Sequence, residues 1–153
     1  MLSVGQFKKK VRRTTEKAFE ELFAEVLAEK GIYNRHMSDK FSGVPDRYVA
    51  GGKWIEFKSL EYARGVVTYG AGMSIEQVRV CGEMVAGEEE VWYCALVATN
   101  KGQFVIWCPM HIVLEQEDNS WNCYDEAHGD AGWCWEYKGK ETIRKLIPRD
   151  WHA

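Results

Sequence analysis

The sequence predicts a single α/β domain in which helices flank a mixed central sheet. Three observations favour this fold class. Segments with the apolar spacing of helices alternate along the chain with segments typical of strands. One of these segments, residues 91–99, is almost continuously apolar, as expected of a central strand buried on both faces. The length of 153 residues is that of one domain with an ordinary core.

The charge of the chain is distributed unevenly. The formal net charge is −3, which by itself does not indicate a nucleic-acid-binding protein. Residues 1–13, however, read as a basic N-terminal arm that contains Lys8, Lys9, Lys10, Arg12 and Arg13. Such an arm is compatible with contact to phosphate groups, and a solvated tail would have the same composition. We expect the arm to precede one domain, residues 14–153.

Cysteine content and hydropathy indicate the compartment. The chain has five cysteines, no Cys-x-x-Cys pair and no signal-like first segment, which predicts reduced thiols in the cytoplasm. Cys94 and Cys108 lie in apolar segments and are expected in the core. The spacing of the other Cys and His residues fits no common zinc pattern. No apolar run is long enough to span a membrane, so we expect no membrane partner.

The first helix is expected to begin at Thr14 or Thr15, either of which can cap it, and to end at Lys30 before Gly31. Its apolar residues form one stripe at helical spacing: Phe19, Leu22, Phe23, Val26 and Leu27. Residues 32–43 are mixed in character, with room for one short strand.

Residues 44–58 predict a β-hairpin around two adjacent glycines. Polar and apolar residues alternate in the return strand, residues 53–58, so that Glu56 and Lys58 point to one face. The apolar residues between them point to the other face, toward the expected core.

The length of the hairpin loop decides the position of Asp46. A two-residue turn would place Asp46 opposite Phe57, whereas a three-residue loop would place it opposite Glu56. Three-residue loops favour a glycine in the third position, in the left-handed conformation. Gly52 occupies that position, so we expect the three-residue loop.

The remaining elements follow in order. Residues 60–72 are rich in Gly, Tyr and Thr and are expected to form a loop. Ser74-Ile75-Glu76-Gln77 has the form of a capping box, which predicts a helix to about Ala86 that ends at Gly87. Further expected elements are strands at 91–99 and 103–108, a short helix after Pro109, a Trp-rich hairpin within 119–138 with its turn at 127–132, and a helix from Lys140 to Ile147.

Asp46, Glu56 and Lys58 are the candidate catalytic residues. Two carboxylates can hold Mg²⁺, a hard cation that prefers oxygen ligands. Such a metal neutralises a phosphodiester and acidifies water, and a nearby lysine can orient that water or stabilise the phosphate charge. The alternative is an ordinary amphipathic hairpin with a charged outer face, since Glu-x-Lys alone is common in strands.

Pro45-Asp46 followed by Glu56-Phe57-Lys58 resembles the signature of the PD-(D/E)XK nuclease superfamily. The resemblance implies a restriction-endonuclease-like αβββαβ core and a metal site that contains Asp46 and Glu56. Residues 19–32, the spacing from Asp46 to Glu56, and Lys145-Leu146-Ile147-Pro148 with Trp151 resemble the phage endonuclease I family of Holliday-junction resolvases. A glutamate of the first helix often joins the metal site in this superfamily, which implies such a role for Glu20.

Glu20 and Gln77 each have a simpler interpretation. Glu20 lies at the edge of the apolar stripe, where a glutamate is ordinarily a surface residue, and Glu16 on the same side is the reserve candidate. Residues 73–77 and the following strand resemble VRR-NUC and archaeal-type resolvase domains, in which a helix-borne glutamine joins the site. Gln77 fits that role, and it can equally close the capping box. The Trp-rich segment 119–138 resembles neither family.

We therefore expect an Mg²⁺- or Mn²⁺-dependent endodeoxyribonuclease that acts on branched DNA such as Holliday junctions. The alternatives are a nuclease of the same class acting on flaps, ends or plain duplex, and a DNA-binding module that does not cleave. Two symmetric cuts across a junction need two sites, so we expect a homodimer. The candidate interfaces are the arm and the Trp-rich segment.

Overall fold

The computed structural model of the chain describes residues 4–37, 43–61, 67–68, 73–99, 102–115, 120–121 and 134–151, with the backbone alone described at 4–15, 61, 67–68, 99 and 120–121. The elements in chain order are α1 (Val4–Glu29), β1 (Asn34–His36), β2 (Arg47–Val49), β3 (Lys53–Glu61), β4 (Val67–Thr68), α2 (Ile75–Ala86), β5 (Glu90–Thr99), β6 (Gly102–Pro109), α3 (Met110–Leu114), β7 (Ser120–Trp121), β8 (Cys134–Glu136) and α4 (Lys140–Leu146).

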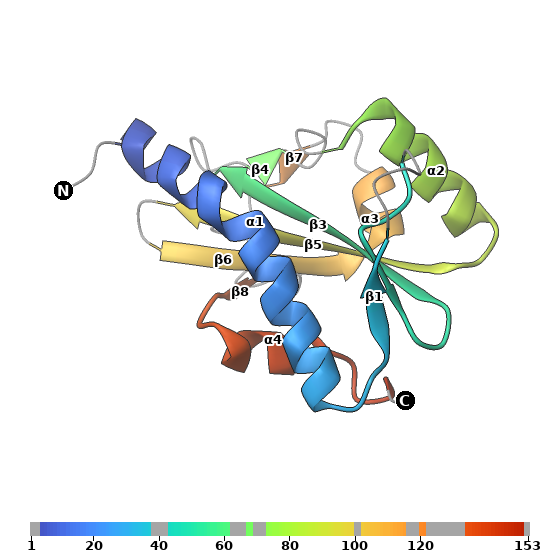
Figure 1. Cartoon of the computed structure of the whole chain (residues 1–153). Coiled ribbons are helices and arrows are strands. Elements are labelled where there is room, and N and C mark those ends of the chain that lie inside the picture. The colour runs from blue at the N-terminus through green and yellow to red at the C-terminus, as the bar shows by residue number, and fades with distance from the viewer. Residues whose placement is uncertain are drawn as a thin grey trace.

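Helices cover both faces of one mixed, open sheet, which confirms the α/β class. The sheet has six strands in the order β1-β2-β3-β5-β6-β8. Helices α1 and α4 pack on one face, and α2 and α3 pack on the other (Figure 1). Within the described residues, none of the helices combines the length and apolar character that crossing a membrane requires.

Helix α1 is longer than the sequence predicts. The expected start at Thr14 or Thr15 is wrong, because the helix begins at Val4 and runs through both threonines. Lysine and arginine favour helix, and no proline interrupts residues 4–30, so nothing stops the helix from extending through the basic segment. The apolar stripe is buried against the sheet as predicted, with Phe19, Phe23, Val26 and Leu27 at most 2% exposed.

The β2–β3 hairpin has the predicted register. Val49 pairs with Lys53, which leaves a three-residue loop. Gly52, the third residue of that loop, has a φ of 79°, in the left-handed region that favours glycine. Continued by one residue past the end of β2, the register places Asp46 opposite Glu56.

Strands β3 and β5 form the centre of the sheet. They pair in parallel, with Glu56 beside Tyr93, and α2 connects them on the second face. Side chains of β5 are buried on both faces, and Cys94 and Cys108 are fully buried, as predicted. Strand β3 extends to Glu61 and β4 follows, so part of the expected loop at 60–72 is strand, and the rest lies outside the described residues.

The predicted hairpin within residues 119–138 is wrong for the residues that the structure describes. Strand β7 pairs with β4 in a separate two-stranded sheet, whereas β8 pairs with β6 at the edge of the main sheet. The physical reason lies in the core, since Trp135 packs against the cluster beneath α1 and so brings β8 to the main sheet. The expected turn at 127–132 lies outside the described residues.

Candidate active site

The segment that leads to Asp46 is fixed by α2 and β3. Gly43 has a φ of 83°, and a Cβ there would lie 2.6 Å from the Glu76 carbonyl oxygen and 2.8 Å from Val80 Cγ2. Only glycine permits this approach to α2. Asp46 Oδ2 accepts a hydrogen bond of 2.8 Å from Phe57 N. The Asp46 carboxylate is therefore held between the helix and the central strand.

Glu56 and Lys58 lie side by side on β3, and Gln77 reaches them from the first turn of α2. Lys58 Nζ is 3.0 Å from Glu56 Oε2. Gln77 Nε2 donates to the same oxygen at 3.0 Å, and Gln77 Oε1 accepts from Lys58 Nζ at 3.0 Å. The structure thus brings together the acid, the lysine and the glutamine that the sequence singles out.

The predicted capping box is present as well. Ser74 Oγ accepts from Gln77 N at 3.1 Å, and Gln77 Oε1 accepts from Ser74 N at 2.9 Å. The same carboxamide oxygen therefore caps α2 and holds Lys58. The two interpretations of Gln77 are compatible, because its oxygen has two lone pairs and its nitrogen is free to donate to Glu56.

Glu56 is the most deeply buried acid of the site. Its side chain is 1% exposed, and Oε1 has no hydrogen-bond partner among the described residues. Burial, assisted by the negative charge of Asp46 and opposed by Lys58, raises the pKa of Glu56 to about 8. A buried carboxylate oxygen without a partner is costly, so the site favours a proton or a cation at this position.

Asp46 is perturbed in the same direction. Burial raises the pKa of Asp46 to about 6 against the lowering effect of the Phe57 N–H, and the charge of Glu20 raises it further. The two carboxylates also repel one another, which is a second cause of the raised pKa of Glu56. Each carboxylate is therefore stabilised when a proton or a cation binds to it.

The residues present fit a divalent cation. Glu56 Oε1 lacks a partner, and the described hydrogen bond of Asp46 uses Oδ2 alone, so each acid has one oxygen to offer. Mg²⁺ and Mn²⁺ prefer such oxygen ligands. No group of three His, Cys, Asp or Glu side chains in the described part of the chain is arranged to hold a metal ion. Water or phosphate oxygens would complete the coordination.

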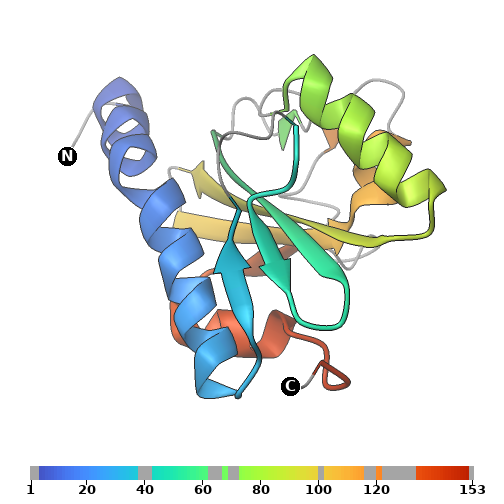
Figure 2. The same ribbon diagram turned by 45° about the vertical axis from the view of Figure 1, so that its right-hand side comes forward.

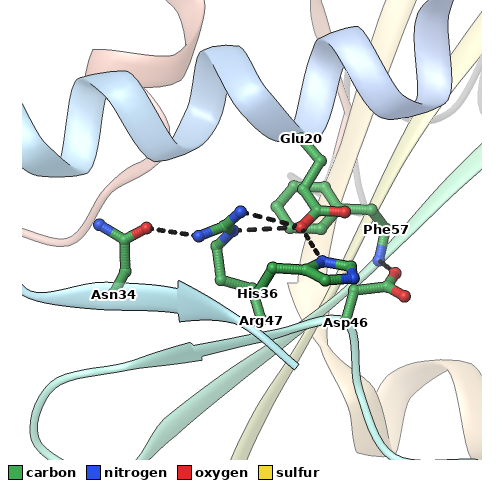
Figure 3. Close-up of polar contacts among 6 residues, drawn as sticks. All are labelled: Glu20, Asn34, His36, Asp46, Arg47 and Phe57. Carbon is green, nitrogen blue, oxygen red and sulfur yellow. Dashed lines mark hydrogen bonds and ion pairs between the residues drawn. The ribbon is translucent and has the colours of Figure 1, made fainter. Parts of the chain in front are cut away.

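Glu20 belongs to a second cluster, on the α1 side of the sheet (Figure 3). Its Oε2 lies 3.1 Å from Arg47 Nη2 and 2.8 Å from His36 Nδ1. Arg47 also donates to Asn34 Oδ1 at 2.8 Å. The structure therefore does not place Glu20 in contact with Glu56, although its charge acts on Asp46. The reserve candidate, Glu16, is exposed.

Sequence reasoning missed the role of Arg47, which is 8% exposed. A signal for it was present. The three-residue loop pairs Arg47 with Ile55, whose side chain faces the core beneath α1. An arginine on that face needs an acid, because an unpaired buried charge is strongly destabilising. Glu20, at the edge of the α1 stripe, is that acid.

Comparisons with models of protein families and with curated proteins find no match for this chain. What the site does is therefore inferred from the chemistry and placement of its own residues.

Proposed function

We propose that the chain is a metal-dependent nuclease of the PD-(D/E)XK class that hydrolyses DNA phosphodiester bonds, with Asp46 and Glu56 as metal ligands. The observation that carries the proposal is the Glu56 carboxylate, which is buried beside a second acid and keeps one oxygen without a described partner. Lys58 offsets part of the repulsion between the two acids, and a proton or a cation relieves the rest. A divalent cation is the partner that two neighbouring acids, each with one oxygen to offer, can share.

Lys58 and Gln77 have separate tasks in this proposal. A bound Mg²⁺ or Mn²⁺ supplies Lewis-acid stabilisation of the phosphate charge and acidifies water. An ammonium has three donors, and the described contacts of Lys58 use two of them. The third donor is available to orient the attacking water or to stabilise a phosphate oxygen. Gln77 holds Lys58 in position, and Glu20 acts on Asp46 from outside, as a positioning residue or an outer ligand.

The order of elements supports the same class. Helix α1, strands β1 to β3, helix α2 and strand β5 follow one another in the order αβββαβ, with β4 inserted before α2. The N-terminus of α2 lies at the site through Gln77. Its backbone N–H groups and helix dipole favour the approach of a phosphate.

Within this class we propose branched DNA, such as a Holliday junction, as the substrate, and a homodimer as the active form. This choice is supported by the resemblance of residues 19–32 and of the Asp46–Glu56 spacing to phage endonuclease I. The basic residues of the segment 8–13 suit contact with the DNA backbone. Flaps, ends and plain duplex are the alternative substrates.

A digest of several DNA forms tests the proposal. The protein is incubated with a four-way junction, a flap, a plain duplex and a plasmid, each with Mg²⁺, Mn²⁺ or EDTA. We expect cleavage of the junction with metal, none in EDTA, and none by Glu56→Gln. Glu89→Gln, which alters an exposed acid outside the site, is the matched control and should cleave like the wild type. DNA binding without cleavage in either metal would instead identify a non-catalytic binding module.

A further inference from the structure

Aromatic side chains continue the sheet face that carries the candidate active site. Arg35 pairs with Tyr48, and Tyr48 pairs with Trp54, so the three side chains share one face across β1, β2 and β3. Trp54 precedes Glu56 by two residues on β3, which places the two side chains on the same face about 7 Å apart. The row therefore borders the Asp46–Glu56 pair.

These three side chains, with Tyr33 and Met37, line an open hollow of about 240 Å³. The Tyr48 and Trp54 rings meet edge to face, with centroids 5.2 Å apart and planes at 69°. Tyr33 is 61% exposed. Met37 N donates to the Asp46 carbonyl oxygen at 2.8 Å, which joins the hollow to the candidate active site. In Figure 2 these strands lie between α1 and α2.

The lining suits a planar, aromatic and negatively charged ligand. Aromatic rings and guanidinium groups both stack on nucleobases, and rings held on neighbouring strands lose little freedom when they do so. Arg35 is exposed and forms no ion pair with the residues that the structure describes. Its charge can therefore pair with a phosphate. A purely apolar ligand would gain nothing from the charge of Arg35, so the lining favours a ligand that carries a negative charge.

We propose that this hollow, the base hollow, binds one unpaired nucleobase of the DNA substrate next to the phosphate that is cut. The choice of DNA as the ligand rests on the proposed function. In an intact duplex every base is paired and stacked, so its entry into the hollow costs the free energy of unstacking and unpairing, which is smallest where the base is already unpaired. The hollow therefore favours flaps, single strands and branch points that carry an unpaired base over plain duplex.

Stacking of a fluorescent base tests the proposal without cleavage. A flap oligonucleotide carries 2-aminopurine, whose emission is quenched on stacking, at the unpaired position, and binding is measured in EDTA. We expect quenching by the wild type and by Tyr33→Phe, which keeps the ring. Tyr33→Leu and Tyr48→Leu should reduce the quenching and weaken flap binding about tenfold, as loss of a base–aromatic stack does.

Paired arginine variants provide the control for charge. Arg35→Ala should weaken flap binding more than Arg149→Ala, which removes an exposed arginine outside the hollow. If Tyr48→Leu does not fold, the variants at the exposed Tyr33 and Arg35 still test the proposal. Unchanged quenching and affinity in Tyr33→Leu and Arg35→Ala would overturn the proposal even where Mg²⁺-dependent cleavage is intact. Quenching without cleavage in any metal would reject the nuclease and leave the base hollow standing.

Discussion

Glu20 and Glu56 are both largely buried glutamates paired with a basic residue, yet their surroundings differ. Glu20 Oε2 contacts Arg47 and His36. Glu56 Oε2 contacts Lys58 and Gln77, while its Oε1 is buried without a described hydrogen-bond partner. An ion pair therefore does not distinguish Glu20 from the candidate metal ligand Glu56. The two acids differ in a buried carboxylate oxygen without a described partner, which Glu56 has and Glu20 lacks.

The two clusters also act on different elements. The Glu20 cluster joins α1 to β1 and β2, so its contacts stabilise the arrangement of a helix on the sheet. The Glu56 cluster joins β3 to the first turn of α2 and holds like charges close together. We infer that the first cluster contributes mainly to stability and the second mainly to activity.

The largest expected effect is on cleavage. Asp46→Asn, Glu56→Gln and Lys58→Ala should each lower kcat/KM by at least about 100-fold, because the first two remove the charge of a metal ligand and the third removes a cation that acts on water or phosphate. Glu20→Gln should lower it less than about tenfold. Cleavage rates on the DNA form that the wild type cuts measure these losses of kcat/KM. Circular dichroism verifies that each variant is folded. An equal loss of kcat/KM in Glu20→Gln would indicate that Glu20 is also a ligand of the site. The two clusters would then not differ in function.

The next effect is on stability with metal. At a concentration of about 100 times Kd, a cation that binds only the folded state stabilises it by about 2.7 kcal/mol. For a chain of this length, that raises Tm by roughly 5–10 °C. We expect this rise with Mn²⁺ or Mg²⁺, its reversal by EDTA, and its absence in Asp46→Asn. Anomalous density between Asp46 and Glu56 in a Mn²⁺-soaked crystal provides the direct check, and an empty, ordered site contradicts the assignment.

A smaller effect concerns pH in the absence of metal. Burial raises the pKa of Asp46 to about 6 and that of Glu56 to about 8, above the ordinary values of 3.8 and 4.5. The folded state then binds more protons than the unfolded state between about pH 4 and 8. The stability contributed by these acids is complete below pH 4 and is lost as the pH rises through 6 and 8.

Thermal unfolding in EDTA measures this pH dependence. Wild-type Tm should fall between pH 5 and 8, and Glu56→Gln should fall less and be several degrees more stable at pH 8. Glu89→Gln, the exposed control, should follow the wild type. Identical dependence of Tm on pH in the wild type and in Glu56→Gln would mean that the ionised Glu56 side chain does not destabilise the folded protein.

The smallest expected effect is on the Glu20 cluster. Glu20→Gln keeps an acceptor for Arg47 but removes the charge, which should cost about 1 kcal/mol, or about 2–4 °C in Tm. Glu76→Gln, in an exposed ion pair with Arg79, should cost less, because solvent screens that pair. If Glu20→Gln stabilises the fold instead, then Glu20, like Glu56, carries an uncompensated charge.

Local signals made much of the site predictable. The loop length and Gly52 fix the position of Asp46 opposite Glu56, and the four residues from Ser74 to Gln77 fix the start of α2. These features depend on neighbours in sequence, where turn and capping rules apply directly. The alternation of β3 likewise places Glu56 and Lys58 on one face.

Features that depend on distant partners were not predictable in this way. The strands β7 and β8 have strand-like sequences, but which strands they pair with is decided by packing elsewhere in the chain. The expected start of α1 at Thr14 or Thr15 is wrong because nothing in residues 4–13 opposes helix, so the threonines do not mark its boundary. The Glu20–Arg47 contact required knowing which strands lie beneath α1.

The shared carboxamide of Gln77 couples two motions. Its oxygen accepts from Ser74 N and from Lys58 Nζ, so fraying of the first turn of α2 removes one of the two described contacts of the lysine and leaves only that with Glu56. Helix ends open locally at low free energy, and such opening is visible in amide hydrogen exchange. The amides of Gln77 and Val78, which donate to Ser74, are therefore native reporters of the site. Protection of these two amides from hydrogen exchange should follow the fraction of molecules in which Gln77 holds Lys58 in position.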